Sequence, residues 1–354
     1  MNADMNAELF SSIADIEREK GIPQSYMLEK IEQALLAALK KNYQASADCV
    51  RVVLDPIERT ISMFIQKTVM ETVDNPNTQC SLEEAREKTP EAEIGDFMDE
   101  PVDTSRFGRI AAQAAKQVII QGIREAERNL VYDEFTSKEH EILTGVVTRV
   151  DPRTGAVSIQ IGANSEHTEA MLSPGERIPN ETLRDGSRIK VYVIEVRKST
   201  RGPQILISRT HPGLVKRLFE LEVPEIYEGL VEIRSIAREA GNRTKVAVCS
   251  NDPDVDPIGA CVGPKGARVN SIVNELGGEK IDIVRFSDDP TEYIASALAP
   301  SEVVAVDVLE DGKSCRVIVP DSQLSLAIGK EGQNVRLAAR LTGFKIDIKA
   351  ESLA

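Results

Sequence analysis

Two short segments with a glycine at each end carry the residue types that bind phosphate. The first, GPKG, covers residues 263–266, and the second, GKEG, covers residues 329–332. Glycines at both corners of such a turn permit tight dihedral angles and leave no Cβ to block an approaching ligand backbone. A helix that begins directly after the turn points its free N–H groups and its partial positive charge at the same place. This combination favours binding of a sugar–phosphate chain.

The two segments belong to an internal repeat. Aligned on the glycines, four positions match without a gap, namely Gly263 with Gly329, Gly266 with Gly332, Val269 with Val335 and Gly277 with Gly343. One inserted residue later, both copies contain the tetrapeptide KIDI. A single G-x-x-G is a weak signal, because a helix-capping turn has the same pattern. Two copies in matching settings predict a repeated structural unit.

The residues around the glycines predict a site for unpaired RNA. Basic residues lie in or just after each turn, and apolar residues before each turn could form a floor for bases. Such a groove holds about four nucleotides. Pro264 lacks an N–H and Glu331 adds a carboxylate, so the two turns need not bind equally. The predicted contact residues are Ile258, Val262, Gly263, Pro264, Lys265, Gly266 and Arg268 in the first copy, and Ile328, Gly329, Lys330, Glu331, Gly332, Gln333, Asn334, Arg336 and Arg340 in the second.

The elements expected around the two turns follow the same order. A helix, a hairpin, the glycine turn, a second helix and a strand occupy about 70 residues each time. This order resembles the type II KH fold, as do the segments IGACVGPKGARVNSIVNELGGEKIDIV and LAIGKEGQNVRLAARLTGFKIDI. We therefore predict two tandem KH domains, at residues 210–286 and 287–354. Cys261, beside the first turn, is interpreted as a packing residue.

The segment before the repeat has the pattern of a small barrel. Five strand-like runs, EILTGVVTRV, GAVSIQIG, HTEAML, RIKVYVIEV and PQILISR, are separated by turn signals such as DPRTG and LRDGS. Five short antiparallel strands are the number in an OB-type barrel, which we place at residues 136–209. The predicted phosphate contacts there are Arg153, Arg188 and Arg197. His167 is either a base-stacking residue or a plain strand residue.

Residues 1–135 predict an α+β domain with a long connector helix. Apolar residues recur at helical spacing before two strand-like runs, CVRVVLD and TISMFIQKTV. Ser81 and Glu84 have the spacing of a capping box. Residues 106–129 predict one helix of about 36 Å, which either separates two modules or packs on the N-terminal sheet. Residues 91–103 contain six carboxylates. We interpret them as a solvated loop, because they lack the D-x-D-x-D-G spacing of a calcium loop.

Composition and charge exclude several classes of protein. No apolar run approaches the ~18 residues of a membrane span, and the N-terminus lacks a signal-peptide pattern. Five scattered cysteines without a C-x-x-C motif indicate a reducing cytoplasm. Three histidines make a metal centre unexpected, and no cofactor is predicted. The net charge of −14 disfavours a polyanionic partner, but it is uneven: −10 in residues 1–135, +2 in 136–210 and −6 in 211–354.

Over essentially its whole length the chain resembles the NusA family of bacterial transcription elongation factors. The opening ELFSSIADIEREKGIP, the connector QVIIQGIREAER, a barrel of the ribosomal S-one type and the two KH signatures carry the resemblance. It implies that the N-terminal domain binds RNA polymerase near the RNA exit channel and the β-subunit flap. It also implies that the barrel and KH domains hold single-stranded nascent RNA and that other Nus factors are partners. Pausing, termination and antitermination are the implied outcomes.

We further expect a cytoplasmic monomer. Some relatives carry acidic repeats after the second KH domain, whereas this chain ends at Ala354. We therefore expect a short form that lacks those repeats.

The alternative classes of function are an RNA-acting enzyme and a ribosome-associated RNA chaperone. An RNA-acting enzyme would need a catalytic domain in residues 1–130, where there is no histidine, no G-x-x-x-x-G-K-[ST] motif and no G-x-S-x-G motif. A ribosome-associated RNA chaperone would bind RNA without contacting polymerase. The sequence therefore predicts no catalytic residue and favours an RNA-binding module.

Overall fold

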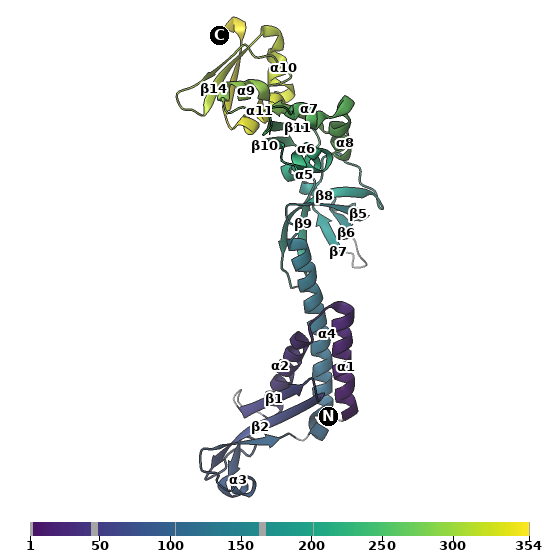
Figure 1. Ribbon diagram of the computed structural model, residues 1–354, viewed down its shortest axis with the longest axis vertical. Coiled ribbons are helices and arrows are strands. Elements are labelled where there is room, and N and C mark those ends of the chain that lie inside the picture. Colours follow the sequence, from purple (N-terminus) through teal and green to yellow (C-terminus); the bar gives the residue numbers. More distant parts are fainter. Residues whose placement is uncertain (1–2, 44–48, 103, 163–167, 201, 354) are drawn as a thin grey trace. The chain divides into compact units, whose positions relative to one another are not determined.

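The structure is a computed structural model that describes residues 3–43, 49–102, 104–162, 168–200 and 202–353. The chain forms two compact units, Met1–Leu130 and Val131–Ala354 (Figure 1). None of the helices in these described ranges combines the length and the apolar character that a membrane span requires.

The first unit packs helices on a small sheet. Its central strand β2 pairs with β1 and β4 in antiparallel and with β3 in parallel orientation. The core lies between apolar residues of α2, such as Met27 and Leu35, and residues of β1 and β2. The elements are α1 (Ala3–Lys20), α2 (Gln24–Tyr43), β1 (Val50–Asp55), β2 (Thr60–Met70), β3 (Gln79–Ser81), α3 (Leu82–Lys88), β4 (Phe97–Pro101) and the first part of α4 (Thr104–Thr136).

Two expectations for this unit are confirmed. The capping box forms at α3, where the Ser81 hydroxyl accepts from the Glu84 N–H and the Glu84 carboxylate accepts from the Ser81 N–H. The long helix α4 extends the predicted range at both ends, and Ile119 and Ile123 pack against the core of the first unit. The middle part of this helix therefore packs against the first unit, where Lys30 of α2 pairs with Glu125 at 3.1 Å.

The interpretation of residues 91–103 as a loop was wrong for Phe97–Pro101. These residues form the edge strand β4, because the backbone pairs with β2 while the carboxylates reach basic residues of neighbouring strands. Glu100 pairs with Lys67 at 2.6 Å, and Asp99 approaches Arg51 at 3.7 Å. Lys67 holds the pKa of Glu100 below its usual value. No cluster suited to a metal ion occurs among the residues that the structure describes; Asp103 lies outside them.

The second unit begins with the predicted barrel. Five strands close in the order β5-β6-β7-β9-β8, and the interior is filled by residues such as Ile159 and Val191. Phe135, near the end of α4, is buried in the same core. Gly145 allows close packing, because a Cβ there would lie 2.3 Å from the Ile159 side chain. The strands are β5 (Ile142–Val150), β6 (Val157–Ile161), β7 (Thr168–Leu172), β8 (Arg188–Arg197) and β9 (Gln204–Ser208).

Two modules with the type II KH order follow the barrel, as predicted. Each contains an antiparallel hairpin whose second strand pairs in parallel with the strand after the glycine turn. The first comprises α5 (Pro212–Glu222), α6 (Pro224–Tyr227), β10 (Val231–Glu239), β11 (Arg243–Ser250), α7 (Pro257–Val262), α8 (Ala267–Glu275) and β12 (Lys280–Arg285). The second comprises α9 (Pro290–Ala297), β13 (Ala305–Val308), β14 (Ser314–Val319), α10 (Leu324–Ile328), α11 (Gln333–Thr342) and β15 (Lys345–Ala350).

The second KH module covers one face of the first module's sheet. Ala237 and Ala247, on β10 and β11, share a core with residues of α9 and α11. Their short side chains let the helices approach, and the Ser235 hydroxyl donates to the Leu341 carbonyl at 2.9 Å. Lys245 is fully buried and donates to the Ala299 carbonyl at 2.7 Å, with Asp282 3.3 Å away. Burial lowers the pKa of Lys245.

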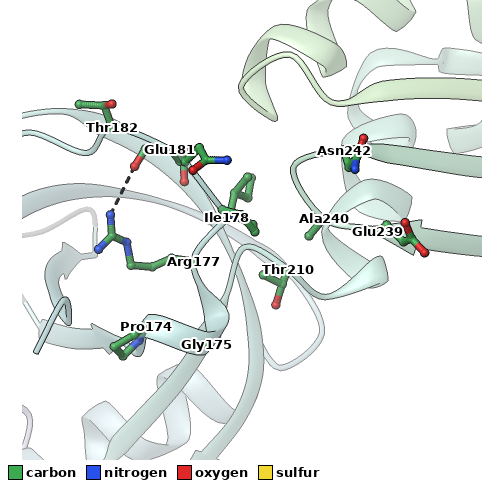
Figure 2. Close-up of a pocket in the computed structure, with 12 residues that line it drawn as sticks. Pro174, Gly175, Arg177, Ile178, Glu181, Thr182, Thr210, Glu239, Ala240 and Asn242 are labelled. Carbon is green, nitrogen blue, oxygen red and sulfur yellow. Dashed lines mark hydrogen bonds between the residues drawn. The ribbon is translucent and has the colours of Figure 1, made fainter. Parts of the chain in front are cut away.

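A groove of about 940 Å³ separates the barrel from the first KH module (Figure 2). Pro174, Gly175 and Thr182 of the barrel line one side, and Glu239 and Asn242 of the first KH hairpin line the other. The two sides of the groove therefore come from different modules. The width of the groove depends on the contacts that join the barrel to the first KH module.

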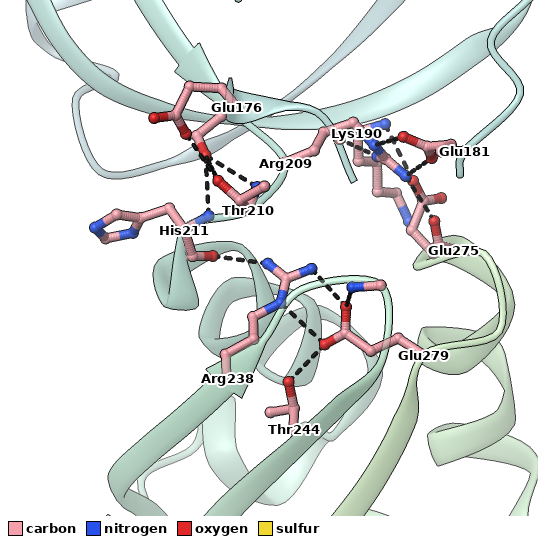
Figure 3. A network of polar contacts seen from close by, with 12 residues as sticks. Glu176, Glu181, Lys190, Arg209, Thr210, His211, Arg238, Thr244, Glu275 and Glu279 are labelled. Carbon is pink, nitrogen blue, oxygen red and sulfur yellow. Dashed lines mark hydrogen bonds and ion pairs between the residues drawn. The ribbon is translucent and has the colours of Figure 1, made fainter. Parts of the chain in front are cut away.

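One buried arginine links the barrel to the first KH module, and a second forms an ion pair inside that module (Figure 3). Arg209 pairs with Glu181 of the barrel and with Glu275 of α8. The Arg238 guanidinium donates twice to Glu279, both at 2.9 Å, and once to the His211 carbonyl. Breaking such a pair by removing one partner leaves a buried charge without compensation.

We expect Glu279→Ala to lower the free energy of opening of strands β10–β12 by about 3–5 kcal/mol, because Arg238 loses its counter-ion in a buried place. Hydrogen–deuterium exchange of the full chain measures this at the strand amides. Arg285→Gln breaks the exposed Arg285–Asp256 pair and should change the value by less than about 1 kcal/mol. Equal effects of the two substitutions would contradict the stabilising role of the buried Arg238–Glu279 pair.

Candidate nucleic-acid interface

The two glycine turns have the same backbone conformation. Each corresponding φ and ψ of Gly263, Lys265 and Gly266 differs by no more than 6° from that of Gly329, Glu331 and Gly332. In both turns the N–H of the last glycine donates to the carbonyl of the first, at 3.0 and 3.1 Å. The repeat that the sequence indicates is therefore a repeat of geometry.

The second inner residue of each turn has a positive φ although it is not glycine. Lys265 lies at φ 52° and Glu331 at φ 53°. This conformation is uncommon for residues with a Cβ, and it persists where the surrounding structure imposes it. The preceding helix contributes to this constraint, because the N–H of the first glycine donates to Gly259 in one module and to Ser325 in the other.

The first glycine of each turn is required by both conformation and space. Gly329 has φ 76° and ψ 170°, a region that is essentially restricted to glycine. A Cβ on it would lie 2.8 Å from the backbone nitrogen of Asn334. A Cβ on Gly332 would have no atom closer than 4.0 Å, so the outer corner of the second turn is open. A ligand backbone can approach this corner.

Each turn carries an unpaired positive charge. Lys265 and Lys330 are exposed, and neither ammonium group has a hydrogen bond or ion pair with any residue that the structure describes. The N-cap residues of α8 and α11 are Gly266 and Gly332, which supply no capping side chain. The N–H of Ala267 donates to the Pro264 carbonyl, and the N–H of Gln333 donates to the Lys330 carbonyl. No N-cap side chain occupies the N–H groups that follow, so they can meet an anion beside a lysine that can reach it.

Two of the predicted contact residues hold the turns instead of facing outward. Arg268 donates to the Ala260 carbonyl at 2.6 Å and pairs with Glu225 at 2.8 Å. Asn334, at the equivalent position, is 3% exposed and donates to the Ala327 carbonyl at 3.0 Å. Both side chains tie the helix after the turn to the helix before it. Because their residue types differ, no sequence pattern indicates this shared role.

Three other predicted contacts converge on one carboxylate of the first KH module. The Glu239 carboxylate accepts from Arg336 at 2.6 Å and from Gln333 at 2.9 Å, and Arg340 lies 3.9 Å away. Arg336 holds the pKa of Glu239 below its usual value. Glu239 was not predicted as a site residue, since its partners lie about 100 residues further along the chain.

The apolar residues before the turns lie at the surface to different degrees. Ile258 and Val262 are half-buried, whereas Ile328 is 37% exposed beside the second turn. Cys261 is fully buried, and burial raises the pKa of its thiol to about 12. This confirms its interpretation as a packing residue.

The predicted barrel contacts do not form one cluster. Arg188 and Arg197 lie at opposite ends of β8, and Arg153 lies in the turn between β5 and β6. Arg197 pairs with Glu195 at 2.7 Å, although both side chains stay exposed. His167 lies outside the described residues. RNA contact by these residues stays a prediction.

Comparison with known proteins shows the family to which this chain belongs. Models of the NusA N-terminal domain, the NusA-like first KH domain and the NusA-like second KH domain match residues 8–129, 209–286 and 290–354. A transcription termination/antitermination protein NusA of Halalkalibacterium halodurans is 53% identical over 350 residues, which cover 99% of this chain and 90% of that protein. This chain belongs to the NusA family.

Two further NusA proteins carry the same description. The Bacillus subtilis protein is 53% identical over 348 residues, which cover 98% of this chain and 92% of that protein. The Thermus thermophilus protein is 42% identical over 359 residues, which cover 99% of this chain and 92% of that protein. The match to NusA proteins therefore includes the barrel, which lies between the segments matched by the three domain models.

Alanine at the two corners of the second turn should have unequal effects. Gly332→Ala places a side chain in the left-handed region and should lower the stability of the second KH module by about 1–2 kcal/mol. Gly329→Ala should lower it further, because its Cβ also meets the Asn334 backbone. Hydrogen–deuterium exchange at α11 measures both. A larger loss for Gly332→Ala would contradict the geometry.

Proposed function

We propose that this chain is a transcription elongation factor that holds single-stranded nascent RNA while bound to RNA polymerase. The observation that carries the proposal is the pair of matching glycine turns, each with an unpaired lysine and the start of a helix. In the second turn the corner at Gly332 is also open. Membership of a family whose curated relatives are described as transcription termination/antitermination proteins supports the transcriptional role.

The turns bind RNA through its backbone. A phosphate lies at each glycine corner, where backbone N–H groups and Lys265 or Lys330 contact it. The unpaired bases then lie against the apolar side chains that precede the turn, among them Ile328. Because most of these contacts go to the sugar–phosphate chain, binding depends on strand geometry more than on base sequence.

The negative charge of the chain fits a tethered RNA-binding protein. Attachment to polymerase presents emerging RNA at a high local concentration, so a modest intrinsic affinity is enough. The net charge of −10 on residues 1–135 disfavours stray nucleic acid and can complement basic patches on a large protein partner. We place the polymerase contact on the first unit, at the β-subunit flap near the RNA exit channel.

The remaining parts of the proposal concern partners and the absence of chemistry. Other Nus factors act with the chain, which is a cytoplasmic monomer that modulates pausing, termination and antitermination. It has no catalytic activity. Specific cleavage of RNA by the pure protein with Mg²⁺ would overturn that last point and favour the enzyme alternative.

We expect Lys265→Asp combined with Lys330→Asp to weaken binding of a short unstructured RNA at least ~10-fold, because both phosphate contacts become repulsive. Fluorescence anisotropy titrations at several salt concentrations measure this. The matched control is Lys216→Asp with Lys313→Asp, which makes the same charge change at exposed lysines of α5 and the second hairpin. Equal losses in both variants would mean that only net charge matters.

A fragment of residues 1–130 should co-purify with RNA polymerase, and residues 131–354 should not do so once RNA is digested. The cut falls between the two compact units. A pull-down with immobilised polymerase core enzyme tests this. Capture of the second fragment alone would reverse the proposed division of labour.

A further inference from the structure

A carboxylate of the first KH module pairs with the arginines of the helix that follows the second glycine turn. Glu239 ends strand β10, and its three partners, Gln333, Arg336 and Arg340, lie on α11 of the other module. Arginine binds carboxylate and phosphate with the same fork of N–H groups. The position of Glu239 is therefore one that an RNA phosphate oxygen could also take.

The contact lies directly beside the turn. Gln333 follows Gly332 in the chain, and Arg336 also donates to the Glu331 carbonyl at 3.2 Å. Its guanidinium thus bridges the turn and the Glu239 carboxylate. A strand that lies against the open corner of Gly332 passes close to this guanidinium.

The first KH module shows what a purely structural pair looks like. Arg268 is 26% exposed, packs against Gly263 and donates to the backbone as well as to Glu225. By contrast, the side chains of Arg336 and Arg340 are 45% and 55% exposed. They remain open to solvent while paired, so a ligand can reach them.

Glu239 also has room to move away. Its side chain is 20% exposed and lies at the edge of the groove between the barrel and the first KH module (Figure 2). Asn242 lines the same groove on the same hairpin. A rotation of the carboxylate toward the groove would release the arginines without separating the two KH modules, whose apolar contact involves Ala237 and Ala247.

We propose that Glu239 is an internal competitor for RNA phosphate at the second glycine turn. The carboxylate neutralises Arg336 and Arg340 in the free protein, and a bound phosphate displaces it. This inference rests on the proposed function, since it assumes that the turn binds RNA. Because a phosphate must first displace the Glu239 carboxylate, the affinity for a single phosphate is lowered. An isolated anion is therefore rejected, whereas an RNA strand that also contacts Lys330 stays bound.

The test is Glu239→Gln in the full chain, titrated with a fluorescent unstructured RNA. Glutamine keeps the shape and one acceptor oxygen for Arg336 but removes the charge. RNA affinity should rise about fivefold, the size of a partly exposed ion pair. The matched control is Glu310→Gln, an exposed carboxylate in the second hairpin with no partner among the described residues; its affinity should stay near that of the unmodified chain.

A double-mutant cycle separates local competition from a general charge effect. In an Arg336→Gln background, Glu239→Gln should produce a smaller gain, because only the more distant Arg340 remains to be freed. Hydrogen–deuterium exchange at α11 checks that the two KH modules stay packed in each variant.

Three results would overturn the inference: an affinity of Glu239→Gln equal to or below that of the unmodified chain, the same gain with and without Arg336, or an equal gain in Glu310→Gln. Failure of the proposed function looks different. In that case the lysine substitutions at the two turns would leave RNA binding unchanged, whatever Glu239→Gln does.

Discussion

The conformation of the four-residue glycine turn is the constraint on which the candidate RNA site depends. Three of the four residues have positive φ, and one of them is a lysine or glutamate. Such a turn exists only because neighbouring groups hold it, namely the helix before it and the Arg268 or Asn334 side chain after it. Its result is a corner without side chains at the start of a helix, which is a suitable place for a phosphate.

The packing of the two KH modules makes the two turns parts of one body. The second module covers the sheet of the first through Ser235, Ala237 and Ala247, so the two modules share one core. The same contact brings Glu239 to the second turn. The two modules are therefore similar in sequence but differ in charge around their turns. The arginines of α11 in the second module pair with Glu239 of the first module.

Local patterns in the sequence predicted most of the fold. The five barrel strands, the two KH orders and the capping box at Ser81 follow from periodicity, turn residues and spacing within short windows. The strands β3 and β4 were missed, because β3 has three residues and β4 lies in an acidic run. The carboxylates of β4 are largely exposed there, and they lie near Lys67 and Arg51 in space. The site was predicted less completely than the fold, since Glu239 contacts residues about 100 positions away. The buried pair of Arg238 and Glu279 likewise has no local signature.

The most direct test of the central claim is an NMR titration of the full chain, labelled with ¹⁵N at glycine, with a short single-stranded RNA. Its 22 glycines make a spectrum small enough to assign. The account predicts that the amide signals of the four turn glycines shift first and most. Shifts confined to the barrel glycines, with the turn glycines unchanged at saturation, would contradict it.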